Sequence, residues 1–409
     1  MKKMNKHYMK NPFHNHTDNN NQNDNNEFIF DSSNNEKNKP DWMKPETAEI
    51  KDNKERFHEE ILNYFNYISP NKETLIKCQD TINLLTKIIK KKKPKWEVIL
   101  FGSYGQTMPT VFSDIDVVIS GDCNKDFELK EMYNLMNILK DEGFCDKIKL
   151  VKAKVSIIKA TCIATGKDVE ISMNKLNGCH AVKVIRKILK KYKILKPAII
   201  ILKILLKKFY LNESNSGGMS SFILFHLVYF VFIHKFKKLN VEEKNEYLPS
   251  NNLKVDEKIN KNEENNSNDE LNIINKEKEI NDENNNDTNN LIENYYKEEE
   301  NNTNYEMNIG EFILLFLKYF GYKFDYKNNG ISLNDDNFGK IFVKNERPDI
   351  KYNNNLCVES IIEKGLNVAK SCYNYEKIVN FFKAVYEKIN SELEKNNLSI
   401  LQSLGFPTI

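Results

Sequence analysis

The chain has 409 residues, of which 40% are hydrophobic and 29% are charged, and its formal net charge is +3. This length is sufficient for two or three domains with a large core, and 14 glycines and 10 prolines are too few for linkers of the Gly/Pro type. The seven cysteines form no CxxC pair and no Cys/His cluster, which excludes a disulfide framework and a zinc site and indicates a reducing compartment.

Charge is distributed unevenly along the chain. Residues 241–305 contain 18 acidic and 7 basic residues, so the rest of the chain carries a net charge of +14. The strongest basic run lies between Glu170 and Glu213, where no acidic residue occurs. A basic folded part indicates a polyanionic partner such as nucleic acid or nucleotide phosphates, although a solvated lysine-rich helix face would show the same pattern.

The first 95 residues predict a tail followed by two helices. Residues 1–45 are rich in asparagine without periodicity, so we expect them to be disordered. Residues 46–95 predict two amphipathic helices that belong in part to a helical central domain. The first has an apolar stripe from Phe57 to Ile68 and ends at Pro70, and the second covers Lys72 to Ile89.

Residues 96–180 predict a small mixed α/β catalytic domain. A buried strand at 97–101 leads directly into a Gly-Ser pair, and a second strand follows through 117–119. A helix over 125–142 and two further strands over 151–160 and 169–173 complete this domain.

Residues 181–240 and 306–390 predict a helical domain that an acidic insert interrupts. The insert, 241–305, has few apolar residues, and we expect it to be disordered. The longest apolar run, Phe222 to Ile233, has twelve residues, whereas a bilayer span needs roughly twenty, so we expect a buried helix and no membrane segment. Further elements are expected in this order: helices at 199–209, 220–234 and 311–320, strands at 330–333 and 340–343, a helix at 375–390 and a C-terminal tail at 391–409.

Two aspartates at the start of the second strand carry the chemistry. Side chains two residues apart on a strand share a face, so Asp114 and Asp116 present two carboxylates while Ile115 faces the core. The two charges repel each other, and a divalent cation is the usual compensation. Upstream, Gly102-Ser103 offers a backbone that approaches phosphate closely and a hydroxyl that binds it. This is the layout of a two-metal nucleotidyl-transfer site.

Such a site needs a third carboxylate, a cation for the phosphates and a surface for the base. Asp168 and Glu170 lie two apart on another predicted strand, and either one is a candidate for the third acid. Lys203 and Lys207 are one helical turn apart and could reach a triphosphate, and Phe222 could stack on a base. The alternative interpretation is that the lysines are solvated and the aromatic ring is part of a core.

These motifs resemble the nucleotidyltransferases of the DNA polymerase β superfamily, in the branch of nuclear poly(A) polymerases that work in TRAMP-type RNA surveillance complexes. The similarity covers roughly residues 55–240 and 306–390. It includes the segments HEEILNYFNYISP, FGS…SDIDVVI, KVSIIKATCIATGKDVEISMNKLNG, LKILLKKFYLNESNSGGMSSF and NLCVESIIEKGLNVAKSCY. It implies an α+β fold, in which a polymerase-β-like nucleotidyltransferase domain with a small mixed sheet packs against a mostly helical PAP/OAS1-like central domain with a PAP-associated segment.

The resemblance also implies roles for individual residues. Asp114, Asp116 and Glu170 would be the catalytic, metal-binding residues, with Glu170 at a position where the family normally has Asp. Ser103 and the two lysines would bind the triphosphate, and Phe222 would replace a tyrosine that stacks on the base. The full set of implied nucleotide-binding residues is Gly102, Ser103, Asn177, Lys203, Lys207, Ser221, Phe222, Glu359 and Asn367.

The last of the similar segments departs from the family pattern of E-D-P followed by N-D-V-G-R. Ser360 replaces the Asp and Lys370 replaces the Arg, while Leu366 falls where uridylyltransferases often carry a His. The lack of this His favours adenosine. The sequence therefore predicts a polynucleotide adenylyltransferase, dependent on Mg²⁺ or Mn²⁺, that adds AMP from ATP to RNA 3′ ends. The alternatives are a terminal uridylyltransferase and a degenerate, non-catalytic RNA-binding scaffold.

The resemblance further implies the setting in which the chain works. It predicts a monomeric catalytic subunit in the nucleus, with the cytoplasm as the alternative. The chain contains no separate RNA-binding module, so an RNA-binding zinc-knuckle protein and a helicase are the implied partners.

Overall fold

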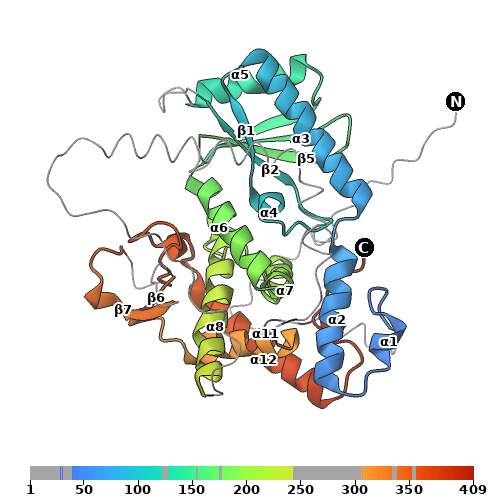
Figure 1. Cartoon of the computed structure of the whole chain (residues 1–409), viewed down its shortest axis with the longest axis vertical. Helices are drawn as coiled ribbons and strands as arrows, with labels where there is room; N and C mark the ends of the chain where they lie inside the picture. The colour runs from blue at the N-terminus through green and yellow to red at the C-terminus, as the bar shows by residue number, and fades with distance from the viewer. Residues whose placement is uncertain are drawn as a thin grey trace, which may run out of the picture.

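The computed structural model describes Phe28, Phe30 and residues 39–121, 128–152, 155–174, 177–242, 305, 307–333, 339–351 and 356–409; the side chains at 177–178 and 235–242 are not described. Most of the predicted tail at 1–45 and nearly all of the predicted insert at 241–305 lie outside the described residues. In Figure 1 the rest forms a sheet domain at the top and a helical domain below it.

The first two long helices belong to different domains. Helix α2 (Asn53–Ile68) begins at Asp52, whose side chain accepts hydrogen bonds from two backbone N–H groups, and ends just before Pro70. Helix α3 (Lys72–Lys92) is preceded by Asn71, whose side chain accepts a hydrogen bond from the N–H of Thr74. The apolar face of α2 packs in the helical core, whereas the face of α3 packs against the sheet. The chain therefore crosses between the domains at Pro70.

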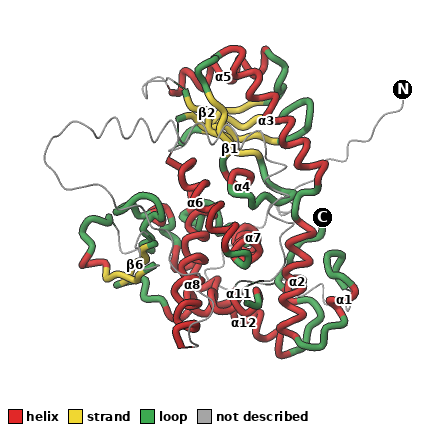
Figure 2. Tube along the Cα trace, viewed as in Figure 1, coloured by secondary structure: helices red, strands yellow, loops and turns green. Residues whose placement is uncertain are grey.

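The sheet has five strands in the order β1-β2-β5-β4-β3. The strands β2 (Ile115–Ser120) and β5 (Asp168–Met173) are parallel, and the other neighbours are antiparallel. The remaining strands are β1 (Glu97–Leu100), β3 (Ile148–Val151) and β4 (Ile157–Thr161). Helices α3 and α5 (Glu128–Asp141) cover one face, as Figure 2 shows with the strands in yellow and the helices in red.

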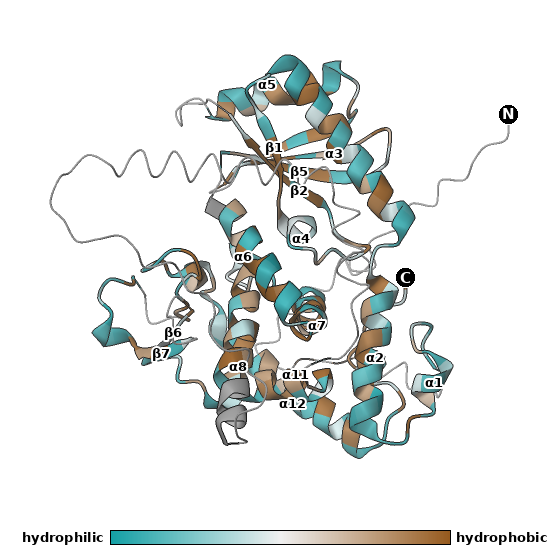
Figure 3. Ribbon diagram, viewed as in Figure 1, coloured by the Kyte–Doolittle hydropathy of each residue, from teal (hydrophilic) through white to brown (hydrophobic). Residues whose placement is uncertain are grey.

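The central strand β2 has two faces with different chemistry. Ile115, Val117 and Ile119 are buried in the core with α3 and α5, as the alternation of the sequence predicts. Val118 packs on the opposite face with Cys179 of α6 (Asn177–Lys191). Figure 3 shows the strongly hydrophobic character of β1 and β2. The even-numbered positions, which include both aspartates, therefore face away from the sheet core.

The single strand predicted over 151–160 is not continuous in the structure. The structure divides this segment between the end of β3 and the start of β4, which pair with each other as an antiparallel hairpin. Lys152 and Lys154 alternate with apolar residues, a pattern typical of a strand, so the sequence does not reveal where β3 ends and β4 begins.

Helices surround a second core that is built from both flanking regions. Helix α7 (Leu195–Lys208) lies at its centre and contacts α2, α8 (Ser221–Glu242) and α11 (Ile309–Lys318). None of the described helices combines the length and the hydropathy that a bilayer span requires. The other elements are α1 (Pro45–Ala48), α4 (Gly102–Gly105), a π-helical turn (Tyr319–Lys323), β6 (Asn329–Ser332), β7 (Lys340–Val343), α12 (Tyr375–Glu394) and α13 (Ile400–Ser403).

The expected C-terminal tail over 391–409 is part of the helical core, which corrects that prediction. Leu401 and Phe406 are buried in the core that contains α2 and α7. The buried carboxylate of Glu60 on α2 accepts hydrogen bonds from the N–H groups of Ile400 (2.9 Å) and Leu401 (3.2 Å). The anchoring partners lie more than 300 residues away in the sequence, so local periodicity carries no sign of them.

Two aromatic residues within the predicted N-terminal tail also have defined contacts. The ring of Phe28 lies 5.8 Å from that of Phe209 and 5.1 Å from that of Phe381, and Phe30 lies 5.4 Å from Phe209. These positions correct the expectation of disorder locally, because both rings pack against the helical core.

Candidate active site

Three acidic side chains meet where β2 and β5 run parallel. Asp114 directly precedes β2, Asp116 lies within it, and Glu170 of β5 is the register partner of Asp116. Asp168 lies one position before the first residue pair of β2 and β5, which is Ile115 with Val169. It is exposed and accepts a hydrogen bond from Thr161 Oγ1 at 2.5 Å. Only Glu170 of the two candidates lines the cavity described below. The geometry therefore favours Glu170 as the third acid.

The Gly-Ser pair lies beside these carboxylates. The N–H of Phe101 donates to the backbone carbonyl of Asp116 at 2.8 Å, which places the turn after β1 against the start of β2. Gly102 has a φ of +58°, a conformation that L side chains rarely adopt, and it begins the short helix α4. Both Gly102 and Ser103 line the same cavity as Asp114 and Asp116.

The cavity has a volume of about 1010 Å³ and lies between the sheet domain and the helical domain. Its sheet side is formed by the Gly-Ser turn and the acids. Its helical side is formed by α7, the start of α8 and a loop that follows β7. The predicted residues that line it are Gly102, Ser103, Asp114, Asp116, Glu170, Lys203, Lys207, Ser221 and Phe222.

Burial and repulsion between carboxylates disfavour the ionised forms of Asp114 and Asp116. Burial raises the pKa of Asp116 to about 7, and the neighbouring charges of Glu170 and Asp114 add to the effect. Burial, followed by Glu170, also raises the pKa of Asp114. Across the cavity, burial lowers the pKa of Lys203, and the attraction of Asp116 opposes that shift. Crowded oxygen donors of this kind fit a hard divalent cation such as Mg²⁺.

Glu170 is turned toward a partner that the sequence did not suggest. Its carboxylate forms an ion pair with the ammonium group of Lys159 on β4, its register partner. Lys159 was missed because its position depends on strand register. The short turn at Thr165-Gly166 is the signal that could have placed it opposite Glu170.

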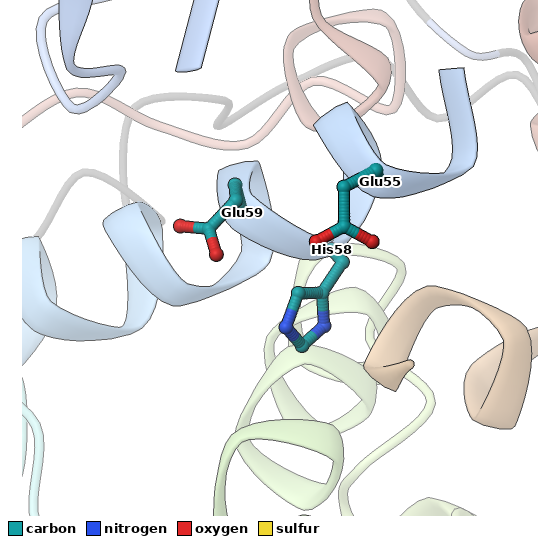
Figure 4. Close-up of side chains that lie close together, drawn as sticks. All are labelled: Glu55, His58 and Glu59. Atoms are coloured by element: carbon teal, nitrogen blue, oxygen red, sulfur yellow. The ribbon is translucent and has the colours of Figure 1, made fainter. Parts of the chain in front are cut away.

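A more compact group of possible metal ligands lies elsewhere in the part of the chain that the structure describes. The ligand atoms of Glu55, His58 and Glu59 on α2 lie within 4.8 Å of one another (Figure 4). His58 Nδ1 accepts a hydrogen bond from the N–H of Ile309 at 3.0 Å, and Glu55 accepts one from Asn308 Nδ2 at 3.3 Å. These bonds fix the start of α11, which gives the group a structural role. Asp114, Asp116 and Glu170 do not form such a compact group among the described residues, and Glu170 is paired with Lys159.

The last of the similar segments, which contains Glu359 to Asn367 and is predicted to recognise the base, is called the recognition segment. Some of its residues line the cavity, and others hold its loop in place from behind. Ser360 and Leu366 line the cavity. Glu359 does not line it: this carboxylate is buried and accepts hydrogen bonds from Arg347 Nη2 (2.8 Å) and the N–H of Gly365 (2.7 Å). Asn367 Oδ1 accepts a hydrogen bond from the N–H of Val358 at 3.0 Å. Both residues therefore shape the loop from behind.

One predicted nucleotide-binding residue is not described. Asn177 begins α6, but its side chain lies outside the described residues. Its neighbours on the same helix, His180 and Ala181, line the cavity. Helix α6 therefore contributes to the cavity wall near the position of Asn177.

Two family models match the chain. Residues 57–190 match the central palm domain of mitochondrial-like poly(A) RNA polymerase, and residues 308–360 match the PAP-associated domain of the Cid1 family of poly(A) polymerases. The matched regions contain the carboxylates at β2 and β5 and the start of the recognition segment. The predicted family resemblance is confirmed.

Curated relatives of this chain include poly(A) RNA polymerases. The chain is 30% identical over 197 residues to poly(A) RNA polymerase protein 2 of Saccharomyces cerevisiae, which is 48% of this chain and 33% of the relative. It is 31% identical over 174 residues to poly(A) RNA polymerase cid14 of Schizosaccharomyces pombe, or 42% of this chain and 25% of that protein. The matches thus span a quarter to a third of the length of these relatives.

Solved structures share the fold at low sequence identity. The polymerase core of TRAMP, an RNA surveillance complex, superimposes with a TM-score of 0.64 at 20% identity over 88% of this chain and 94% of that one. A cytoplasmic RNA terminal U-transferase gives 0.62 at 18% identity over 88% and 99%. The predicted α+β class, with a polymerase-β-like domain and a helical domain, is confirmed.

Proposed function

We propose that the chain transfers AMP from ATP to the 3′ end of RNA without a template, because it matches the palm domain of mitochondrial-like poly(A) RNA polymerase and the PAP-associated domain of the Cid1 family. The observation that carries this proposal is the arrangement of charges in one cavity. The Asp114 and Asp116 carboxylates lie on one side, and Lys203 and Lys207 lie on the other. A triphosphate with divalent cations fits between them.

In this reaction the 3′-hydroxyl oxygen of RNA bonds to the α-phosphorus of ATP. The bond from that phosphorus to the α–β bridging oxygen breaks, pyrophosphate leaves, and the hydroxyl proton is released. Asp114, Asp116 and Glu170 would hold Mg²⁺ or Mn²⁺, which neutralises charge on the attacking and leaving oxygens. Ser103, Lys203 and Lys207 would bind the phosphates, and Glu170 would orient the attacking hydroxyl.

We propose that the cavity prefers ATP to UTP as the substrate. Phe222, at the start of α8, offers a ring on which any base can stack, so it carries no selectivity. Leu366 lines the cavity and is 44% exposed, and its side chain offers no hydrogen bond to a base. A terminal uridylyltransferase is the second candidate, since a U-transferase shares the fold.

We also propose a cellular setting. The likeness to the polymerase core of TRAMP, an RNA surveillance complex, supports a role in RNA surveillance. We propose that this role is nuclear and that an RNA-binding zinc-knuckle protein and a helicase are the partners. Imaging of the tagged chain tests the nuclear location, and purification of the tagged chain under native conditions tests both partners.

Primer extension with each of the four nucleotides, in Mg²⁺ and in Mn²⁺, tests the activity. We expect extension with ATP by the wild type and none by the double variant Asp114→Ala/Asp116→Ala. Preferential use of UTP would favour the uridylyltransferase. Equal, near-zero extension by wild type and double variant would instead support a non-catalytic scaffold.

A further inference from the structure

The imidazole of His226 on α8 is hydrogen-bonded through both ring nitrogens. Nδ1 lies 2.7 Å from the backbone carbonyl oxygen of Phe222, and Nε2 lies 3.1 Å from the backbone nitrogen of Ile361. A backbone N–H can only donate, so Nε2 accepts and Nδ1 carries the proton that is donated to Phe222. These bonds require the neutral ring with one defined tautomer.

The surroundings of His226 keep it in that state. Its side chain is fully buried, and its ring centroid lies 4.5 Å from that of Phe222 in an edge-to-face arrangement. Burial lowers the pKa of His226 to about 4, so the ring is neutral at physiological pH.

The two partners of His226 belong to two parts of the helical side of the candidate nucleotide site, the start of α8 and the loop 360–366. Phe222 lines the cavity from α8, and Ile361 lies between Ser360 and Ile362, which line it from the loop 360–366. His226 thus connects the stacking ring to the loop from behind, without lining the cavity itself.

Hydrogen bonds within the loop 360–366 link its two ends and its first turn. The N–H of Ser360 donates to the carbonyl of Leu366 at 2.8 Å. The Ser360 hydroxyl oxygen accepts bonds from the N–H groups of Ile362 (3.2 Å) and Glu363 (3.3 Å). A bond to Ile361 therefore positions the whole loop, including Leu366.

We propose that His226 is a positioning residue that sets the separation between the Phe222 ring and the loop 360–366, and so determines how tightly and how selectively the incoming base is held. The inference rests on the proposed function, in which this cavity binds a nucleoside triphosphate. His226 acts only through Phe222 and the backbone of Ile361.

Two amide variants separate the bonds of His226. In His226→Gln the longer side chain can place its carbonyl oxygen near the position of Nε2, where it accepts from Ile361. In His226→Asn the amide can still donate to Phe222, but it is too short to reach Ile361. Both variants lose the aromatic ring, and each is designed to keep one of the two hydrogen bonds: Gln the bond to Ile361 of the loop, and Asn the bond to Phe222. His226→Phe keeps the ring volume and loses both bonds.

The measurements are the affinity for an ATP analogue with a non-cleavable α–β bridge by calorimetry, and KM and kcat for ATP and UTP in primer extension. We expect His226→Asn and His226→Phe to weaken analogue binding and raise KM for ATP about tenfold, equivalent to about 1.4 kcal/mol. The ATP-over-UTP ratio of kcat/KM should fall, and kcat should change by less than about threefold. His226→Gln should keep KM within about threefold of the wild type.

A merely structural role gives a different result. It would lower the melting temperature and the active fraction of all three variants while KM and the ATP-over-UTP ratio stay unchanged, and this would overturn the inference. If the Asn variant does not fold, the Phe variant against the Gln variant gives the same comparison. A wild type that extends no primer, yet shows the expected differences in analogue binding, would refute the proposed function and retain the inference.

Discussion

A Cβ atom added to Gly102 would lie 1.9 Å from Oδ2 of Asp116, well inside the closest approach of real atoms. The carboxylate thus occupies the space that a side chain at position 102 would fill. The same glycine has a φ of +58°. Position 102 therefore requires glycine for two independent reasons, one of conformation and one of space.

We predict that Gly102→Ala reduces nucleotidyl transfer by more than about 100-fold, because displacement of a catalytic group by about 1 Å has effects of that size. The positive φ adds a stability cost of about 1–2 kcal/mol. Gly143→Ala is the matched control, since Gly143 has a φ of +69° and no atom lies within 4 Å of its added Cβ. The control should lose similar stability and keep its activity. Equal activity losses in both variants would contradict the steric explanation.

The ion pair between Lys159 and Glu170 predicts an effect on the requirement for metal. The ammonium group of Lys159 is paired with the Glu170 carboxylate and would compete with a divalent cation for it. Lys159→Met should therefore lower the Mg²⁺ concentration for half-maximal extension about threefold, a change typical of a partly exposed charge. Lys149→Met is the control, because Lys149 is the register partner of Lys159 on β3, one strand further from the acids. A raised requirement for Mg²⁺ in Lys159→Met would show that Lys159 orients Glu170 instead.

The neighbouring lysines at the end of α7 predict opposite phenotypes. Lys207 lines the cavity, whereas Lys208 Nζ donates to the carbonyls of Leu404 (3.0 Å) and Gly405 (2.9 Å). Lys207→Met should raise KM for ATP about tenfold and leave the melting temperature unchanged. Lys208→Met should leave KM unchanged and reduce the free energy of unfolding by about 1–3 kcal/mol. Steady-state kinetics and denaturant unfolding of both variants check the pair, and a shared phenotype would refute the assignment.

The sequence predicts those parts of the site that depend on local pattern. The alternation around Asp114 and Asp116 is enough to place both carboxylates on one strand face, because a strand has a period of two. The spacing of Lys203 and Lys207 likewise places both on one face of a helix. These residues all line the cavity.

Features that depend on register or on distant contacts could not be read in this way. Lys159 reaches Glu170 only through the pairing of β4 with β5. Glu359 matches a family motif, yet the bonds from Arg347 and Gly365 hold it behind the loop. His226 reads as a packed histidine on an apolar helix, and its bond to Ile361 spans 135 residues. Tertiary contacts of this kind leave no periodicity in the sequence.

The buried imidazole of His226 also predicts how stability depends on pH. Its pKa falls from 6.5 to about 4 on folding because of burial, which the bond to the Phe222 carbonyl opposes in part. The rings of Phe222 and Phe225 pack against it, and no charged group contributes to the shift among the described residues. Between pH 6.5 and pH 4 the imidazole of His226 is therefore protonated in the unfolded chain and neutral in the folded protein. The contribution of His226 to the free energy of unfolding is complete above pH 6.5 and is lost as the pH falls toward 4.

Between about pH 8 and about pH 5 the wild type should lose about 2 kcal/mol of unfolding free energy more than His226→Gln, which has no titrating group at this position. Urea unfolding at both pH values, followed by a probe of the helical domain, measures the difference. Other carboxylates and histidines titrate equally in the two proteins, so they cancel in the comparison. Identical pH dependence of wild type and variant would mean that His226 keeps an ordinary pKa in the folded protein, and that its ring is accessible to protons despite the burial seen in the structure.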